Sequence, residues 1–190
     1  MTTVYEHLER FAGEIVGGWP HDPDGKKLPF QVVQTAGGPH LGTTTFSTLG
    51  LGKIPLSDGK AEPRMIRHEL VMIVPADAVP ANIVGILQQA GMEAISRNTA
   101  YLRGEMLGPR GPLFEGFEPK ALYACIPVYF PDEFSSAITE EAGEVVFVWL
   151  VPLLDSEAHY LHVNGWRAFE QKLIAEDPDL TDYRRTAPAL

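Results

Sequence analysis

The sequence predicts a single α+β domain, a layered sandwich in which helices pack against a mixed, mostly antiparallel sheet. Two observations support this fold class. The chain has 190 residues, the usual size of one domain, and is 45% hydrophobic and 21% charged. Its short apolar segments come as runs of strands between helices, without strict alternation. We expect the domain to span residues 1–178, followed by a short polar tail over residues 179–190.

The first element is an amphipathic helix. Thr3 and Glu6 have the spacing of a capping box, in which each side chain binds a free N–H group at the helix start. The stripe that follows is apolar at helical spacing and consists of Val4, Leu8, Phe11 and Ile15. We expect this helix to end at Gly17-Gly18 and a turn-rich connection to cover residues 19–25.

Three strands are predicted next. Phe30–Thr35 and Thr43–Leu49 are rich in β-branched residues, which suit a pleated surface. Gly50–Pro63 contains glycines, prolines and charges and is predicted to be a surface loop. Ile66–Val74 ends in five apolar residues, which indicates a central strand buried on both faces.

The middle of the chain predicts a helix and a hairpin. Ala81–Arg97 has a helical apolar stripe, although Gly85 and Gly91 weaken it and could divide it into two pieces. Ala121–Phe130 and Val145–Leu154 are predicted strands, joined by an acidic turn.

Two short helices complete the predicted fold. Glu157–Asn164 is helical in pattern, and either Asp155 or Ser156 can cap it. Gly165 is the expected C-terminal glycine of this helix, after which Trp166–Ala175 resumes helical spacing.

The charge balance narrows the class of partner. Lys and Arg total 15 against 25 Asp and Glu, a formal net charge of -10. Nucleic acids and anionic membranes require basic surfaces, so both are poor partners, whereas a basic protein is favoured. One acidic group flanks the predicted hairpin and is our candidate partner-binding patch, with a merely solvated loop as the alternative: Asp132, Glu133, Glu140, Glu141 and Glu144.

The single cysteine and the termini suggest a cytoplasmic protein. Cys125 excludes an intrachain disulfide and lies in an apolar segment that would raise its thiol pKa and blunt its reactivity. The N-terminus has no signal-peptide pattern, and the apolar runs are too short to span a bilayer.

Catalytic motifs are sparse, and we expect no cofactor. There is no Gly-x-Ser-x-Gly elbow, and Gly50-Leu51-Gly52-Lys53 lacks the rest of a phosphate-binding loop. His159 and His162 are the best metal candidates, yet a third ligand is not apparent. His68-Glu69, at a strand start, is nonspecific.

Several segments together resemble the Suppressor-of-fused-like family, and the resemblance extends over roughly residues 4–175. The C-terminal part is the strongest: a strand ending in a valine–proline step, then a helix with a glycine joint. The supporting segments are Tyr5–Glu9, Gln34–Gly50, Arg67–Asp77, Phe147–Leu153, Glu157-Ala158 and Asn164–Phe169.

The resemblance implies a bacterial-type, single-domain binding protein. The animal member of the family restrains a transcription factor of the Hedgehog pathway by binding it, and bacterial members are associated with toxin–immunity systems. We therefore expect a non-enzymatic immunity-type protein that neutralises a toxin or a regulatory partner, with peptide capture at a sheet edge as one mode. The alternatives are a small metal-dependent hydrolase centred on His159 and His162, and a regulatory domain with a ligand pocket under Gly50–Pro63.

Overall fold

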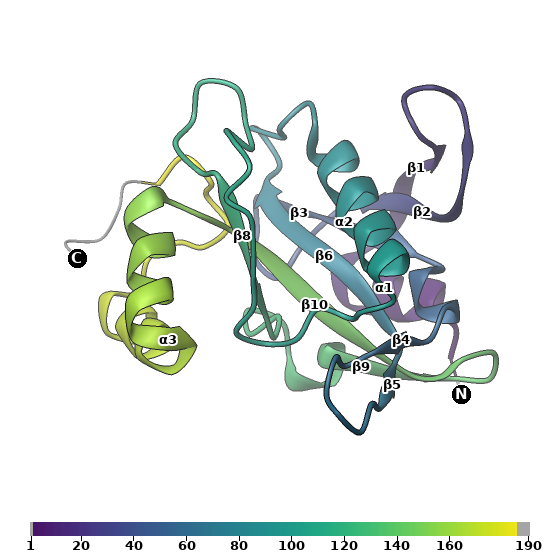
Figure 1. Cartoon of the computed structure of the whole chain (residues 1–190). Coiled ribbons are helices and arrows are strands. Elements are labelled where there is room, and N and C mark those ends of the chain that lie inside the picture. Colours follow the sequence, from purple (N-terminus) through teal and green to yellow (C-terminus); the bar gives the residue numbers. More distant parts are fainter. Residues whose placement is uncertain (1, 186–190) are drawn as a thin grey trace.

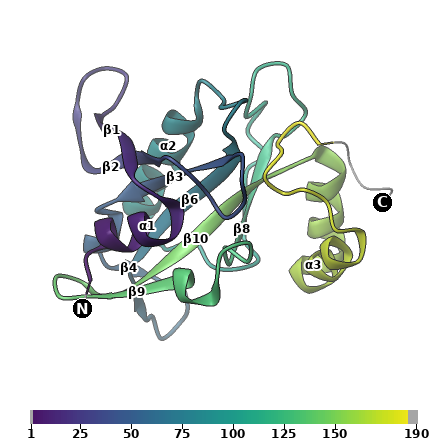
Figure 2. The same cartoon turned by 180° about the vertical axis from the view of Figure 1, so that it is seen from behind.

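The computed structural model describes residues 2–185, which form three layers. A central sheet is covered on one face by helix α2 (Ile83–Arg97). The other face carries α1 (Val4–Ala12) and α3 (Asp155–Glu176), as the two opposite views show (Figures 1 and 2). The predicted α+β class is confirmed. Within the described residues no helix is both long and apolar enough to cross a membrane.

The main sheet is mixed and mostly antiparallel, as predicted. Its only parallel pair among the described strands is β6 with β10, which the chain connects through α2 and β8. The strands run in the spatial order β1 (Ile15–His21), β2 (Lys27–Thr35), β3 (Thr43–Leu49), β6 (His68–Pro75), β10 (Gly143–Leu153), β8 (Ala121–Cys125) and β7 (Met106–Leu107). β9 (Ser136–Thr139) also pairs with β10, and β4 (Leu56–Ser57) with β5 (Met65–Ile66) forms a separate small hairpin.

Strand β6 divides the hydrophobic core into two halves. Because side chains alternate along a strand, Leu70 and Met72 face the core under α2, whereas Val71 and Ile73 face the core under α1 and α3. Every residue from His68 to Val74 is buried. The predicted central strand, buried on both faces, is confirmed.

The N-terminal prediction is correct at its start and wrong at its end. The capping box of Thr3 and Glu6 is present. The helix stops at Ala12, however, because Gly13 adopts a φ of 84° that ends the helical path. Gly17-Gly18 lies inside β1, which continues to His21 and occupies the start of the predicted turn over residues 19–25.

Helix α2 is one continuous helix, so the suggested division at its glycines does not occur. Gly91 has a packing role, because a Cβ there would lie 2.4 Å from Cζ of Phe30. Glycine thus allows the helix to approach β2 closely, and this packing offsets the low helical propensity of glycine.

The predicted strand over Ala121–Phe130 is too long. β8 ends at Cys125, and Pro127 and Pro131 follow in irregular chain, because proline cannot donate to a strand ladder. The chain then forms a 3-10 turn, η2 (Asp132–Ser135), and the unpredicted strand β9.

Helix α3 contains the predicted glycine joint. Gly165 has φ 78° and ψ 164°, which kinks the helix between its two halves. The predicted caps are wrong, since Asp155 and Ser156 lie in the first helical turn. Leu154 precedes the helix instead, and its N–H donates to the Glu157 carboxylate at 2.9 Å.

The chain after α3 returns to the domain. We call residues 177–185 the C-terminal strap, in which Leu180, Thr181 and Tyr183 are buried. Tyr129 anchors the strap, because its hydroxyl donates to the carbonyl of Pro178 at 3.1 Å and accepts the N–H of Leu180 at 3.3 Å. Residues 186–190 of the expected tail lie outside the described residues, and the boundary at residue 178 stays a prediction.

Candidate binding surface

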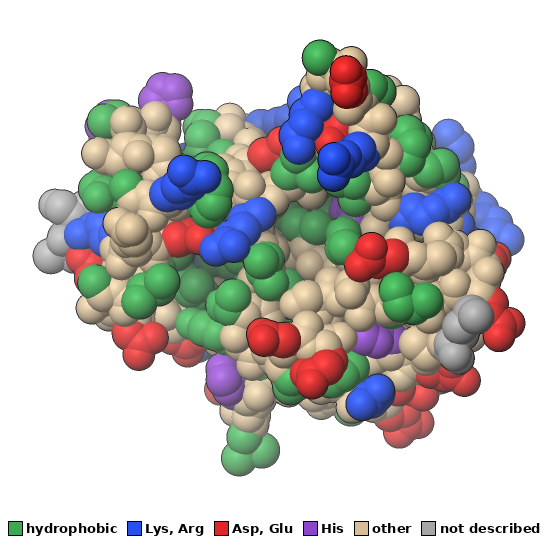
Figure 3. All heavy atoms as spheres, turned by 90° about the horizontal axis from the view of Figure 1, so that it is seen from below, with side chains coloured by type: hydrophobic (Ala, Val, Ile, Leu, Met, Phe, Trp, Pro, Cys, Tyr) green, Lys and Arg blue, Asp and Glu red, His purple; other side chains and the backbone are tan. Residues whose placement is uncertain are grey.

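The five acidic residues of the candidate patch lie on η2, on the turn between β9 and β10, and at the start of β10. All five are exposed. Glu141 forms an ion pair with Lys53 at 2.8 Å, whereas the other four form none with any described residue. Acidic and basic side chains are interspersed on the face seen in Figure 3, with hydrophobic side chains between them. That the five acidic residues together form one partner-binding patch stays a prediction.

Four of the five acidic residues border two different grooves, each of about 790 Å³. Glu140 and Glu141 line the first, and Asp132 and Glu144 line the second. We call the first the Glu69 groove; its walls come from the start of α1, β2, the segment Leu49–Lys53 and the β9–β10 turn. We call the second the Cys125 groove; its other lining residues are Met65, Ile66, Arg67, Tyr101, Leu102, Arg103, Ile126, Ser135, Ser136, Ala142 and Val146–Val148.

The Glu69 groove is built around a buried carboxylate without a cation. Oε1 of Glu69 accepts the N–H groups of Gly50 and Gly52 at 2.9 and 3.0 Å, and Oε2 accepts the hydroxyl of Thr48 at 2.6 Å. Burial raises the pKa of Glu69, and these hydrogen bonds oppose that rise. The carboxylate therefore holds the Gly50–Lys53 turn against β6.

That turn also shapes the rim of the Glu69 groove. Part of the predicted Gly50–Pro63 loop is ordered structure, the 3-10 turn η1 (Leu51–Lys53) and β4, and Leu51 and Leu56 are fully buried. Gly50, Gly52 and Lys53 line the groove, so this segment does border a pocket.

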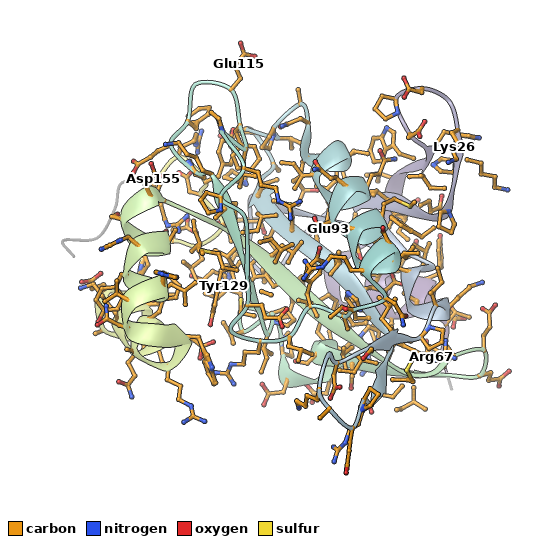
Figure 4. The ribbon with its side chains drawn as sticks, in the orientation of Figure 1. Lys26, Arg67, Glu93, Glu115, Tyr129 and Asp155 are labelled. Atoms are coloured by element: carbon orange, nitrogen blue, oxygen red, sulfur yellow. The ribbon has the colours of Figure 1, made fainter. Side chains whose placement is uncertain are left out.

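The Cys125 groove combines exposed apolar side chains with unpaired acidic ones. Met65 is 56% exposed and Ile126 is 38% exposed. Arg67 lies beside β5 (Figure 4), and its Nη1 donates to the carbonyls of Gly52 and Lys53 at 3.2 and 2.6 Å. The lining of the groove therefore combines apolar and charged side chains.

Strand β10 changes neighbours at this groove. On one side it pairs with β6 over Val146–Trp149. On the other side β9 pairs as far as Val146 and β8 begins at Trp149. Phe147 and Val148 thus have registered strand partners only in β6, which leaves a short interruption of the sheet within the groove.

A third depression continues the Cys125 groove. This Val128 hollow, of about 180 Å³, shares Arg103, Cys125 and Ile126 with the groove. Val128 is 64% exposed and Ile174 is 80% exposed. Tyr129, whose ring packs on Trp149 with centroids 5.0 Å apart, also lines the hollow and lies between α3 and the sheet (Figure 4). We call the groove and the hollow together the apolar trough.

Arg103 stands where the two parts of the trough meet. It donates to Glu170 of α3 through Nε and Nη2, at 3.0 and 2.5 Å, so its charge is neutralised. The hydroxyl of Tyr123 donates to the same carboxylate at 2.9 Å. This arrangement fixes the second half of α3 beside β8.

The chemistry-bearing residues singled out from the sequence lie apart. His159 and His162 are exposed on α3, and no group of three or more His, Cys, Asp and Glu in residues 2–185 is placed to hold a metal ion. Cys125 is half-buried in the wall of the trough, and burial raises its thiol pKa.

His68 and Glu69, which the sequence analysis set aside as nonspecific, are both buried polar residues. His68 is fully buried, and neither ring nitrogen has a hydrogen-bond partner among the described residues. Burial lowers its pKa to about 4. The available signal was the placement of His68 and Glu69 at the start of an apolar strand, where a polar side chain must either be exposed or find partners.

Comparison with known proteins identifies the family. The family model for Suppressor of fused protein (SUFU) matches residues 26–186. No curated protein matches the sequence. Among solved structures, a putative SUFU homolog from Neisseria gonorrhoeae FA 1090 is 18% identical with a TM-score of 0.74, and the match covers 96% of this chain and 92% of that one.

Two further structures have the same fold. Drosophila Suppressor of Fused is 14% identical with a TM-score of 0.70; the match covers 97% of this chain and 50% of the Drosophila chain. A chain from the Sufu–Fu complex is 14% identical with a TM-score of 0.56, over 90% of this chain and 75% of that one. On the strength of the family match over most of its length, this chain belongs to the Suppressor of fused family.

Proposed function

We propose that this chain is a protein-binding domain of the immunity type, which neutralises a cognate toxin or a regulatory partner by stoichiometric binding. Family membership supports a binding role, and one structural relative was solved as a Sufu–Fu complex. The observation that carries the proposal is the apolar trough.

The trough has the composition of a protein interface. Interface cores are apolar and enclosed by a polar rim, and connected apolar depressions on a soluble protein mark binding sites. Here Met65, Ile126, Val128 and Ile174 expose apolar surface around two connected depressions. Asp132 and Glu144 add exposed charged groups to the lining of the Cys125 groove.

The interrupted sheet suggests how a partner segment would sit. An extended peptide can bind where a strand lacks a neighbour, through its backbone. Phe147 and Val148 are the residues of β10 that have a neighbour only on the β6 side, and both line the trough. The net charge of -10 would speed encounter with a basic partner.

Capture from lysate of the source cell tests this proposal when it is combined with a matched pair of variants. Val128→Asp with Ile174→Asp places charge in the trough. Leu41→Asp with Val163→Asp adds the same charge at exposed apolar residues that do not line it. We expect one protein to be retained stoichiometrically by the wild type and the control but lost from the trough variant. Equal retention by all three, or no retained protein, would contradict the proposal.

The Glu69 groove supports a second candidate, a regulatory domain that binds a small ligand. Its size is typical of ligand sites, and Gln31 and Lys53 supply polar groups to it. A thermal-shift screen of small polar metabolites, with Gln31→Ala as the groove variant, tests it. The hydrolase alternative has less support, because His159 and His162 are exposed without a third ligand among the described residues. Bound-metal analysis and His162→Ala test that alternative.

A further inference from the structure

The charges along the Cys125 groove do not balance. Asp132 and Glu144 line it and have no ion-pair partner among the described residues. Arg103 is neutralised by Glu170, which leaves the Arg67 guanidinium as the only unpaired cation of the described lining. The lining therefore has two unpaired carboxylates and one unpaired guanidinium, and Nη1 of that guanidinium already donates to two backbone carbonyls.

The neighbouring Glu69 groove has no such imbalance at its rim turn. Lys53 and Glu141 pair across the mouth at 2.8 Å, and the buried carboxylate of Glu69 has three hydrogen-bond donors. Glu140 also lines the Glu69 groove without an ion-pair partner among the described residues, but Lys27 lines the same groove unpaired, whereas the unpaired cation of the Cys125 groove already donates to two carbonyls.

An unsatisfied imidazole lies under the same groove. The ring of His68 packs edge-on against Tyr101, with centroids 6.2 Å apart, and its strand position is registered with Val146. Tyr101 and Val146 both line the groove. A buried polar group without partners is costly.

We infer that the Cys125 groove recognises an extended segment of a basic protein, in which apolar side chains enter the groove and an adjacent lysine or arginine pairs with Asp132 and Glu144. This inference rests on the proposed function and names the chemistry of its partner. Of the five acidic residues of the candidate patch, these two provide selectivity, and Glu133, Glu140 and Glu141 do not.

Synthetic peptides test the inference directly. Three short fluorescein-labelled peptides would share their apolar residues and differ only in carrying lysine, glutamate or glutamine at two positions. We expect fluorescence anisotropy at low salt to show the lysine peptide binding about tenfold more tightly than the glutamate peptide. The advantage should shrink as salt rises, because exposed charges are screened.

A pair of variants with equal charge change locates the effect. Asp132→Asn with Glu144→Gln should reduce the affinity for the lysine peptide about five- to tenfold. Glu133→Gln with Glu140→Gln removes the same charge outside the Cys125 groove and should leave the affinity nearly unchanged.

Two results would overturn the inference: equal binding of the three peptides, or equal effects of the two double variants. These outcomes are separate from the failure of the proposed function. If a partner is captured through the apolar residues of the trough while the charge variants have no effect, protein binding stands and recognition of a basic segment is wrong.

Discussion

The Glu69 groove and the apolar trough each depend on a buried glutamate, but the two glutamates are stabilised differently. Glu69 receives hydrogen bonds from Thr48, Gly50 and Gly52, all within its own half of the chain and without a cation. Glu157, also fully buried, is paired with Arg185 at 2.6 Å at the end of the C-terminal strap.

The difference concerns how completely each carboxylate is satisfied. Both oxygens of Glu69 accept hydrogen bonds. At the other site, Oε1 of Glu157 and Nε and Nη1 of Arg185 have no partner among the described residues. The strap contributes Pro178 and Leu180 to the lining of the trough. This part of the trough therefore depends on the Glu157–Arg185 pair, whose hydrogen bonding is less complete than that of Glu69. The Glu69 groove is therefore the more rigidly supported of the two.

The largest expected effect comes from breaking the strap. Arg185→Met leaves Glu157 buried without its cation, and we expect the free energy of unfolding to fall by about 3–5 kcal/mol. Urea denaturation measures it. Adding Glu157→Met removes the stranded charge and should recover much of the loss. A fall below about 1 kcal/mol for the single variant would show that the pair does not hold the strap.

Glu69→Leu tests how much the hydrogen bonds of Glu69 stabilise the Glu69 groove. It leaves the N–H groups of Gly50 and Gly52 and the hydroxyl of Thr48 without their acceptor, at about 1 kcal/mol each. We expect a loss of about 3 kcal/mol in the same denaturation experiment. Glu69→Gln keeps one oxygen acceptor and should lose less; equal losses for Leu and Gln would argue against this account of the groove.

His68 makes the free energy of unfolding depend on pH. Its folded pKa of about 4 lies below its ordinary value of 6.5, so the unfolded state binds the extra proton between these values. The wild type therefore loses stability from this group as pH falls through that window. His68→Leu lacks the contribution and should gain about 2 kcal/mol relative to the wild type between pH 7.5 and pH 5.

The control for this titration is His162→Leu, which removes an exposed histidine from α3. The raised pKa of Glu69 changes the stability with pH in the opposite direction to His68. Glu69 is present in the wild type and in both variants, so the difference between a variant and the wild type reports the histidine alone. Parallel stability curves for the wild type and His68→Leu would contradict the assignment.

The smallest expected effect is at the mouth of the Glu69 groove. Lys53 and Glu141 are 58% and 68% exposed, and exposed pairs contribute little because water and salt screen them. Lys53→Met should change the free energy of unfolding by less than about 1 kcal/mol. A loss of unfolding free energy as large as that of Glu69→Leu would show that the Lys53–Glu141 pair, and not Glu69 alone, stabilises this groove.

The sequence predicted the elements whose signals are local. Thr3 and Glu6 cap α1, Gly165 kinks α3, and the apolar run of β6 lies at the centre of the sheet. β1 was missed because Gly17-Gly18 is typical of a helix end, while pairing with β2 decides its conformation. β9 is only four residues long, and its pairing with β10 fixes it.

The binding surface could be predicted only in part, for the same reason. Asp132 and Glu144 were recognised as acidic and exposed, but their separation from Glu140 and Glu141 into different grooves follows from the fold of the hairpin. The trough joins β5, the segment after β8 and α3, which are far apart in sequence. The partner of Glu157, supplied by Arg185, likewise follows from the tertiary structure.

Site-specific photocrosslinking tests most directly whether the trough binds a protein. Benzoylphenylalanine would replace Val128 in the trough or Val163 on the outer surface of α3, which are 64% and 63% exposed. Irradiation in the source cell should crosslink one defined protein from position 128 and not from position 163. No crosslink from position 128, or the same products from both positions, would contradict a binding role for the trough.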